Sequence, residues 1–525
     1  MDFINWITIT LSLIGLTSLP LLTFFNRKKI LNEFSKISSK VWISFLVLVI
    51  ASAFLRFFWI LHAQVVYSDG FLFVNIARTL RDFNVNATCA FVSDGVCEKY
   101  HYSFYWPPVY PLMLSLVFRV FDYSESLTFN FSALLGTISV FISFFLAYIW
   151  TKKEVVALVS AALFSLTPVL LKFSGGPSLV FPFLIFSLLA TLFFELFLET
   201  KDRYIFLLFL SALLCAIYTR IEGFLLIFVF AAGFLIREEC YLNIKKSIGS
   251  FFKKKFYRNS LAIYLLVLIP IFATIYNFVV RHPLAGWTPG ALETLNYFLD
   301  HSSRNIRFLL EPQKNLLISS FLIVLGAIYS LVKKKKEFIS FTLFFIGYFT
   351  LYSSFDMGDM LRGSNVKYSM ILFVPLFYFL SMGIELVGEK ISRVKLSKLI
   401  TFLILISLAG ASFMPTINFI QDGYDDTTLP FRQNRDKFEE FDYILGVTLF
   451  PYIVFDIDSV NTASFLDNEN YFKNKNVGVL KTGDWYLYDG DNLKKIEEKY
   501  QFEEVFVIGE ISPEEPIGLF RMKNN

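Results

Sequence analysis

Long apolar runs separated by short polar loops make up most of the chain. A helix that crosses a bilayer needs roughly 20 consecutive apolar residues. Twelve segments meet this pattern, near residues 5–25, 41–61, 126–150, 154–171, 178–198, 203–219, 222–237, 261–280, 315–332, 338–354, 368–388 and 399–418. The pattern predicts an all-α polytopic membrane protein with about 12 transmembrane helices.

Lysine and arginine are distributed unequally between the loops. Alternate loops, beginning with 26–40, hold 24 Lys/Arg in 63 residues, whereas the other set, beginning with 62–125, holds 12 in 120. Cytoplasmic loops are enriched in Lys and Arg, so we expect the first set to be cytoplasmic. Both termini and the loop 62–125 then lie outside the cell membrane.

The run from Pro108 to Phe121 is apolar but short, and it contains Pro111 and Arg119. Counting it as a span would place the later lysine clusters outside, against the distribution of positive charge. We therefore expect a helix that lies in the outer membrane interface.

The C-terminal tail differs in composition from the rest of the chain. Residues 421–525 hold 21 Asp/Glu against 11 Lys/Arg. Short apolar runs at 452–455, 477–480 and 505–508 favour buried strands, and 494–500 favours a crossover helix. The tail is predicted to be a small extracytoplasmic α/β domain that acts as a lid or docking module.

These patterns divide the chain into three parts. Residues 1–40 form an extra N-terminal transmembrane helix with a cytoplasmic loop, residues 41–418 form the main transmembrane domain with the outer loop 62–125, and residues 419–525 form the α/β domain. A hydrophobic share of 55%, only 18% charged residues and a mean hydropathy of +0.56 exclude a soluble enzyme and a disordered chain.

Cysteine and basic residues narrow the range of partners. The four cysteines give no metal pattern, but Cys89 and Cys97 share one loop and can form a disulfide if that loop faces an oxidising side. The basic residues form no continuous face, so nucleic acid is not an expected partner.

Residues suited to chemistry are concentrated in the outer loops. Asp69 follows the second span, and an aromatic and proline-rich stretch runs from His101 and Tyr102 to Pro111. The later outer segments contribute Lys172, Arg220, Glu222, Asp356, Asp359, Arg362 and Lys367.

This arrangement resembles the GT-C superfamily of polyprenyl-phosphate-sugar-dependent glycosyltransferases, in particular the protein O-mannosyltransferases and the bacterial aminoarabinose-lipid A transferases. The shared features are an acidic residue after an early span, the Pro-Pro-x-Tyr-Pro sequence at 107–111, the Thr-Arg-x-Glu-Gly turn at 219–223 and a basic-Tyr pair at 367–368. The resemblance covers roughly residues 41–390.

The resemblance implies a catalytic domain that moves mannose or another hexose from dolichyl or undecaprenyl phosphate to a hydroxyl of a protein, lipid or glycan. By analogy, Asp69 is the general base that takes the hydroxyl proton. Arg suits phosphate oxygens, so the cations are assigned to the donor phosphate and the other polar groups to the substrate. The first set is Arg220, Arg362, Lys367 and Lys172; the second is His101, Tyr102, Glu222, Asp356 and Asp359.

Each assignment has a structural alternative. Asp69 can cap the following helix, Arg220 can pair with Glu222 to fasten a turn, and Arg362 can anchor the chain at the interface with Lys367. Gly70 stands where relatives carry a second acidic residue, and the outer loop 174–178 has no carboxylate. The sequence thus leaves a divalent metal open and assigns no cofactor.

Two other functions remain compatible with the sequence. The first is a non-catalytic lipid or polysaccharide transporter, or flippase, with an outer partner-binding domain. Scarce intramembrane charge and the lack of visible inverted repeats favour the enzyme over this alternative. The second is a membrane scaffold with a decayed site.

Overall fold

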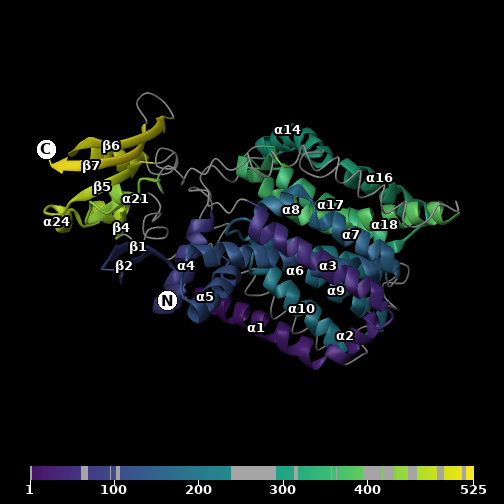
Figure 1. Ribbon diagram of the computed structural model, residues 1–525. Coiled ribbons are helices and arrows are strands. Elements are labelled where there is room, and N and C mark those ends of the chain that lie inside the picture. The colour runs from purple at the N-terminus through teal and green to yellow at the C-terminus, as the bar shows by residue number, and fades with distance from the viewer. Residues whose placement is uncertain are drawn as a thin grey trace.

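The computed structural model describes residues 3–60, 69–94, 96–101, 107–237, 291–311, 317–355, 358–361, 363–393, 417, 431, 433–446, 458–481, 490–510 and 516–524. Helices form an elongated bundle, and a β-sheet domain lies at one end of it (Figure 1). The described helices of the bundle, including η1, η2 and η5, are α1 (Phe3–Phe25), α2 (Arg27–Phe34), α3 (Ser39–Phe54), η1 (Leu55–Trp59), α4 (Asp69–Phe83), α5 (Val109–Phe121), α6 (Glu125–Thr151), α7 (Glu154–Ser165), α8 (Pro168–Phe173), α9 (Val180–Thr200), α10 (Arg203–Ile217), η2 (Ile221–Phe224), α11 (Leu225–Arg237), α14 (Ala291–Leu310), α16 (Leu317–Val332), α17 (Lys336–Ser353), η5 (Gly363–Leu372) and α18 (Phe373–Arg393).

The described helices agree with a membrane protein. Five are long and apolar enough to cross a bilayer, namely Thr8–Phe25, Ser39–Trp59, Glu125–Thr151, Val180–Thr200 and Asn365–Lys390. The shorter apolar helices are Val109–Phe121, Glu154–Ser165, Arg203–Ile217 and Ser319–Val332. The predicted spans at 261–280 and 399–418 lie outside the described residues except for Ile417, so the total of twelve stays a prediction.

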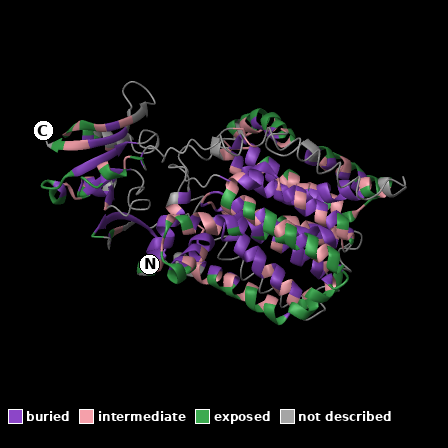
Figure 2. Cartoon of the chain, in the orientation of Figure 1, coloured by how far each residue is buried: buried purple, intermediate pink, exposed green. Residues whose placement is uncertain are grey.

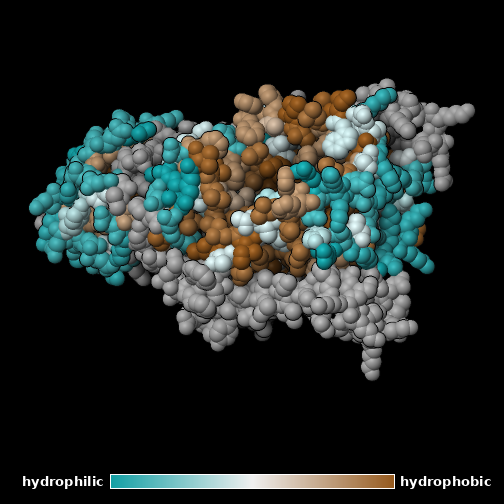
Figure 3. All heavy atoms as spheres, turned by 90° about the horizontal axis from the view of Figure 1, so that it is seen from below, coloured by the Kyte–Doolittle hydropathy of each residue, from teal (hydrophilic) through white to brown (hydrophobic). Residues whose placement is uncertain are grey.

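The middle of the helix bundle carries exposed apolar side chains. Figure 3 shows hydrophobic side chains over the middle of the molecule, between hydrophilic ends. Ile43 and Val47 of α3 and Phe58 of the short helix η1 (Leu55–Trp59) are largely exposed, and exposed residues follow the outward sides of α1 and α3 in Figure 2. Such exposed apolar side chains suit contact with lipid. The predicted helix between Pro108 and Phe121 is confirmed as α5, which packs on α4.

Close helix contacts depend on glycine. A Cβ on Gly326 of α16 would lie 1.7 Å from the carbonyl oxygen of Phe379, and one on Gly383 of α18 would lie 2.0 Å from that of Leu322. The backbones of α16 and α18 can approach this closely only because both positions lack a side chain, as is common where membrane helices cross.

Two buried carboxylates of the bundle are paired with cations. Glu195 of α9 accepts a hydrogen bond from Arg237, and Arg237 also lies 2.9 Å from Glu337. Buried Glu385 of α18 lies 2.9 Å from Lys153 and 3.2 Å from Lys335. Leaving one of these buried charges without a partner would be costly. The ion pairs avoid this cost and join the ends of neighbouring helices.

The β-sheet domain has seven strands in the order β2-β1-β4-β3-β5-β7-β6. Strand β3 is parallel to β4 and β5, and the other pairs are antiparallel. The strands are β1 (Thr88–Ser93), β2 (Val96–His101), β3 (Tyr443–Gly446), β4 (Ser459–Asn461), β5 (Val477–Lys481), β6 (Tyr500–Glu510) and β7 (Pro516–Asn524). The helices of this part are α21 (Arg435–Phe438), α23 (Thr462–Asp467), α24 (Glu469–Phe472) and α26 (Gly490–Glu497).

The C-terminal sheet agrees with the α/β prediction. Strands β5 and β6 contain the predicted strands at 477–480 and 505–508, and α26 overlaps the predicted helix at 494–500. The helix ends at Glu497 because Tyr500 already begins β6. The predicted strand at 452–455 lies outside the described residues.

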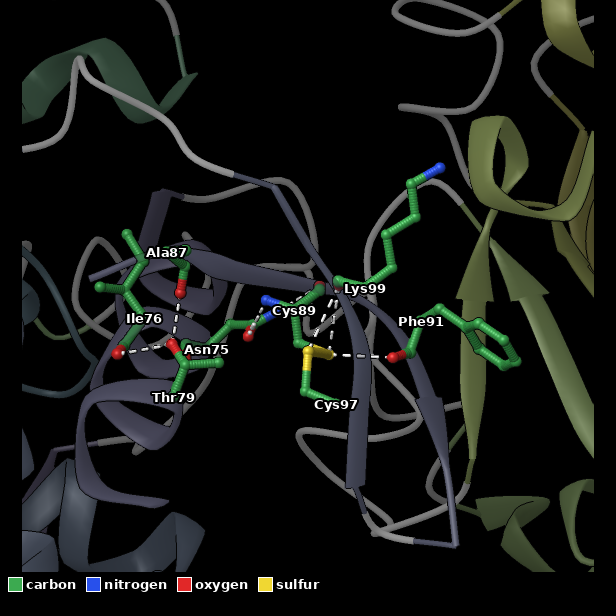
Figure 4. Close-up of a disulfide and its surroundings, with 8 residues drawn as sticks. All are labelled: Asn75, Ile76, Thr79, Ala87, Cys89, Phe91, Cys97 and Lys99. Carbon is green, nitrogen blue, oxygen red and sulfur yellow. Dashed lines mark hydrogen bonds between the residues drawn. A yellow bond between two sulfur atoms is a disulfide. The ribbon is translucent and has the colours of Figure 1, made fainter. Parts of the chain in front are cut away.

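The loop between the second and third predicted spans supplies two strands of this sheet. A disulfide joins Cys89 of β1 to Cys97 of β2, so the conditional prediction of a bridge is confirmed. On one side, the Asn75 side chain of α4 exchanges two hydrogen bonds, of 3.0 and 3.2 Å, with the Cys89 backbone. Figure 4 shows Phe91 pointing the other way, toward the C-terminal strands.

Phe91 joins the hydrophobic core of the C-terminal sheet. Its ring lies 6.0, 5.7 and 5.5 Å from the rings of Tyr443, Tyr471 and Phe472. The Ser93 hydroxyl lies 2.8 Å from that of Tyr443. Strand β1 is buried along its whole length, since α4 covers one of its faces and the tail packs on the other.

Candidate active site

The site begins where α4, α5 and the turn after α10 meet. Asp69 is the first residue of α4, and one turn later the Phe73 ring packs edge-to-face on Tyr110, with the centroids 6.1 Å apart. The backbone N–H of Val109 donates to the carbonyl oxygen of Tyr218 at 3.1 Å. The proline-rich segment is thereby fixed to the turn that carries Arg220.

Arg220 and Glu222 form a close ion pair in this turn. Nη2 of Arg220 donates to Glu222 Oε1 at 2.6 Å, and Nε donates to Oε2 at 3.3 Å. The Arg220 side chain is only 12% exposed and that of Glu222 21%. The predicted alternative, that this pair fastens the turn, is therefore what the structure contains.

The pair is stably ionised despite its burial. Burial alone lowers the pKa of Arg220, but the carboxylate of Glu222 more than offsets this and holds the pKa above its ordinary value. Burial raises the pKa of Glu222, but Arg220, aided by the charge of Lys367, holds it below its ordinary value. Both groups are thus charged at neutral pH. Nη1 of Arg220 has no hydrogen-bond partner among the described residues, so this part of the guanidinium can bind a further acceptor.

Three tyrosines surround the ion pair. Tyr348 of α17 donates its hydroxyl hydrogen bond to the backbone oxygen of Glu222 at 2.9 Å. The ring of Tyr352 lies 5.1 Å from that of Tyr368 in η5, and the guanidinium carbon of Arg220 lies 5.4 Å from the Tyr368 ring centroid. Aromatic faces attract cations, so this wall favours the guanidinium.

Lys367 and Lys172 lie on elements that border this wall. Lys367 Nζ is 5.5 Å from the centroid of the Tyr368 ring. Lys172 is half-buried in the short helix α8, which packs against η5. The two predicted phosphate-binding lysines therefore come from elements in contact, Lys172 from α8 and Lys367 from η5.

The segment 358–361 connects α17 to η5. Asp359 is buried, accepts a 3.0 Å hydrogen bond from Arg304 of α14 and caps the Leu361 N–H at 2.9 Å. Asp359 is thus a paired carboxylate with both oxygens engaged. The substrate contact of Asp359 stays a prediction.

The remaining predicted residues are only partly described. The structure gives the backbone of Asp69 and His101 but not their side chains, and Tyr102, Asp356 and Arg362 lie outside the described residues. In the part of the chain that is described, no three His, Cys, Asp or Glu side chains form a group that could hold a metal ion.

Sequence reasoning missed the contributions of α14 and α17. Tyr348 and Tyr352 fall within a predicted span, where aromatic residues are common. The predicted spans leave residues 291–310 in the loop between the spans near 261–280 and 315–332. Their alternation of apolar and polar positions with a helical period is the signal that could have revealed α14.

A known protein family matches part of the sequence. The model of the dolichyl-phosphate-mannose-protein mannosyltransferase family matches residues 106–273, which include both the proline-rich segment and the Arg220 turn. No curated protein matches the sequence.

Solved structures with a similar fold were found despite low sequence identity. ArnT from Cupriavidus metallidurans in the apo state has a TM-score of 0.56 and 12% identity over 91% of this chain and 97% of that one. The archaeal oligosaccharyltransferase AglB from Archaeoglobus fulgidus, in complex with an inhibitory peptide and a dolichol-phosphate, has a TM-score of 0.53 and 14% identity over 93% and 74% of the two chains. ArnT bound to undecaprenyl phosphate gives 0.51 and 11%, over 92% and 98%. At such identities the similarity establishes the fold.

Proposed function

The chain has the fold of the GT-C glycosyltransferases, and we propose that it moves a sugar, mannose or another hexose, from a polyprenyl-phosphate donor to an acceptor hydroxyl on the outer face of the membrane. The observation that carries this proposal is the junction of the proline-rich segment with the Arg220 turn through the Val109–Tyr218 hydrogen bond. Both motifs lie within the region matched by the mannosyltransferase family model.

The reaction needs a base on the acceptor side. The acceptor oxygen attacks the anomeric carbon, its proton passes to the carboxylate of Asp69, and the bond from the anomeric carbon to the phosphate oxygen breaks. Polyprenyl phosphate leaves as an anion and needs no proton. The place of Asp69, first in α4 and one turn before the Phe73–Tyr110 contact, supports this role.

The donor phosphate needs cations. We assign it to Lys367, Lys172 and Arg362 together with the Nη1 edge of Arg220. Since Glu222 neutralises much of the Arg220 charge, Arg220 contributes directional hydrogen bonds and the lysines contribute most of the net positive charge. Glu222, Asp356, Asp359, His101 and Tyr102 are assigned to the sugar and acceptor.

The lipid part of the donor needs an apolar site. A small hollow lies between α7, α14, α16 and α18, beside the start of α18. Its lining is mostly apolar and includes Phe164, Leu309, Ile323, Phe373 and Leu380. Isoprene units are apolar, like this lining, and Phe373 of the lining directly follows η5, which carries Lys367.

The test is sugar transfer by purified protein in detergent, with radiolabelled polyprenyl-phosphate mannose or glucose and crude membranes as acceptor. Asp69→Asn should abolish transfer because its amide cannot accept the proton. Asp82→Asn, the same change at the last turn of α4, should retain it, and both variants should elute like the native protein.

Each other result has a definite meaning. If transfer survives in Asp69→Asn, the base lies elsewhere and its assignment is wrong. If the native protein neither transfers sugar nor hydrolyses the donor, the glycosyltransferase proposal fails in favour of the transporter or scaffold.

A further inference from the structure

Helix α14 buries two polar side chains and a phenylalanine along one face. His301, Asn305 and Phe308 follow one face of the helix and are buried, whereas Leu295 and Leu299 on another face are more than half exposed. Burial of an amide is unfavourable unless its donors and acceptor are satisfied. The partners of the Asn305 amide therefore indicate why it is there.

Asn305 makes three hydrogen bonds to the last residue of α17 and to the chain that follows it. Its Nδ2 donates to Ser353 Oγ at 3.0 Å and to the carbonyl oxygen of Gly358 at 2.9 Å. Its Oδ1 accepts from the N–H of Met360 at 2.8 Å. A carbonyl only accepts and a backbone N–H only donates, so these partners fix the orientation of the amide.

Two further contacts hold the same segment. Arg304, the neighbour of Asn305, binds the Asp359 carboxylate. Gly358 packs so tightly that a Cβ there would lie 1.6 Å from the carbonyl oxygen of Tyr352. Residues 358–361 are thus held between α14 and the end of α17, and Asn305 of α14 binds their backbone at Gly358 and Met360.

The held segment leads directly to the proposed phosphate site. After Leu361 the chain continues through Arg362 into η5, where Lys367 and Tyr368 lie beside the Arg220–Glu222 pair. The backbone position set at Met360 therefore determines where this cationic segment enters the site.

We propose that Asn305 is a positioning residue for the donor phosphate, acting through the backbone of 358–361. This inference rests on the proposed function. Asn305 does not touch the attacking hydroxyl of the acceptor, whose proton passes to Asp69 on another element. Its loss should weaken binding of the donor in the ground and transition states alike, which raises KM and leaves kcat nearly unchanged.

The experiment measures donor KM and kcat for three variants of the full-length protein. Asn305→Leu removes all three hydrogen bonds at similar volume. Asn305→Asp keeps the acceptor for Met360 N–H but loses both donors. Ser303→Ala alters an exposed hydroxyl on the same helix. We expect the KM for polyprenyl-phosphate sugar to rise about tenfold or more in Asn305→Leu, less in Asn305→Asp and not at all in Ser303→Ala, with kcat within about twofold.

Hydrogen exchange of the same proteins provides a readout that does not depend on activity. The amide of Met360 should exchange faster in Asn305→Leu than in Ser303→Ala. An unchanged KM in Asn305→Leu, or a fall in kcat at constant KM, would overturn the positioning role while leaving the proposed function intact. A native protein that is inactive with every donor would instead refute the proposed function, and this inference with it.

Discussion

Replacing Phe91 with alanine tests whether the hairpin β1–β2 is a structural part of the C-terminal domain. Phe91 is 8% exposed and packs on the rings of Tyr443, Tyr471 and Phe472. Truncating a buried phenylalanine to alanine costs about 3–5 kcal/mol. Since each 1.4 kcal/mol is about a factor of ten, local opening of the sheet should become roughly 100- to 4,000-fold more frequent.

The measurement is hydrogen exchange at the amides of β1 and β4 in the full-length protein. Lys99→Ala is the matched control, because Lys99 on β2 makes an ion pair with Asp467 in which the side chains are 43% and 66% exposed. Such a pair contributes about 0–1 kcal/mol. Exchange in β4 that is equally slow in both variants would refute the shared core, since the tail would then keep its stability without the hairpin.

Three further predictions concern covalent linkage, helix packing and pH. Cys97→Ser should lower the stability of the hairpin by about 2.5 kcal/mol, the chain-entropy value for a short closed loop, as measured by exchange at β1. Gly383→Ala should lower the thermal midpoint, because its Cβ meets a backbone carbonyl of α16 and costs about 1–3 kcal/mol or more of stability, whereas Gly388→Ala on the same helix, with open space around it, should not. The pKa of Glu222 is depressed in the folded protein, so its pairing with Arg220 contributes fully to stability above the ordinary carboxyl pKa. This contribution is lost as pH falls through the lower folded-state pKa. The stability difference between native protein and Glu222→Gln should therefore shrink below about pH 4, and a constant difference would contradict the pairing.

The sequence predicts best where the signal is local. Transmembrane helices such as α6 and α9 are continuous apolar runs, and the Arg220–Glu222 pair joins residues two positions apart. The disulfide between Cys89 and Cys97 likewise closes a short segment. In each case the chain itself limits the partners that a residue can reach.

The rest depends on contacts between distant parts of the chain. Strand β1 pairs with β4 through Phe91 and Val460, and no composition or periodicity links residues so far apart. The role of Asn305 is equally hidden, because an asparagine in a polar stretch is typical of a loop. Asn305 matters because it is buried against residues 358–361 and binds their backbone, a contact that exists only in the folded chain.

The orientation of the site has physical support from the charge distribution and the disulfide. The loops predicted cytoplasmic hold most of the lysine and arginine, and the Cys89–Cys97 bridge lies in a loop predicted to be outside. Labelling of single cysteines introduced at Ser303 and at Lys334 in intact cells should modify the first and spare the second. Labelling in the reverse pattern would invert the proposed topology.

The most direct test of the central claim follows the donor itself. Purified protein is incubated with polyprenyl-phosphate mannose and a hydroxyl acceptor, and mass spectrometry measures free polyprenyl phosphate together with the mass gained by the acceptor. A glycosyltransferase releases one polyprenyl phosphate for each hexose transferred. A donor that stays intact with every acceptor, while the protein in vesicles moves that lipid between leaflets, would contradict the claim and identify a transporter.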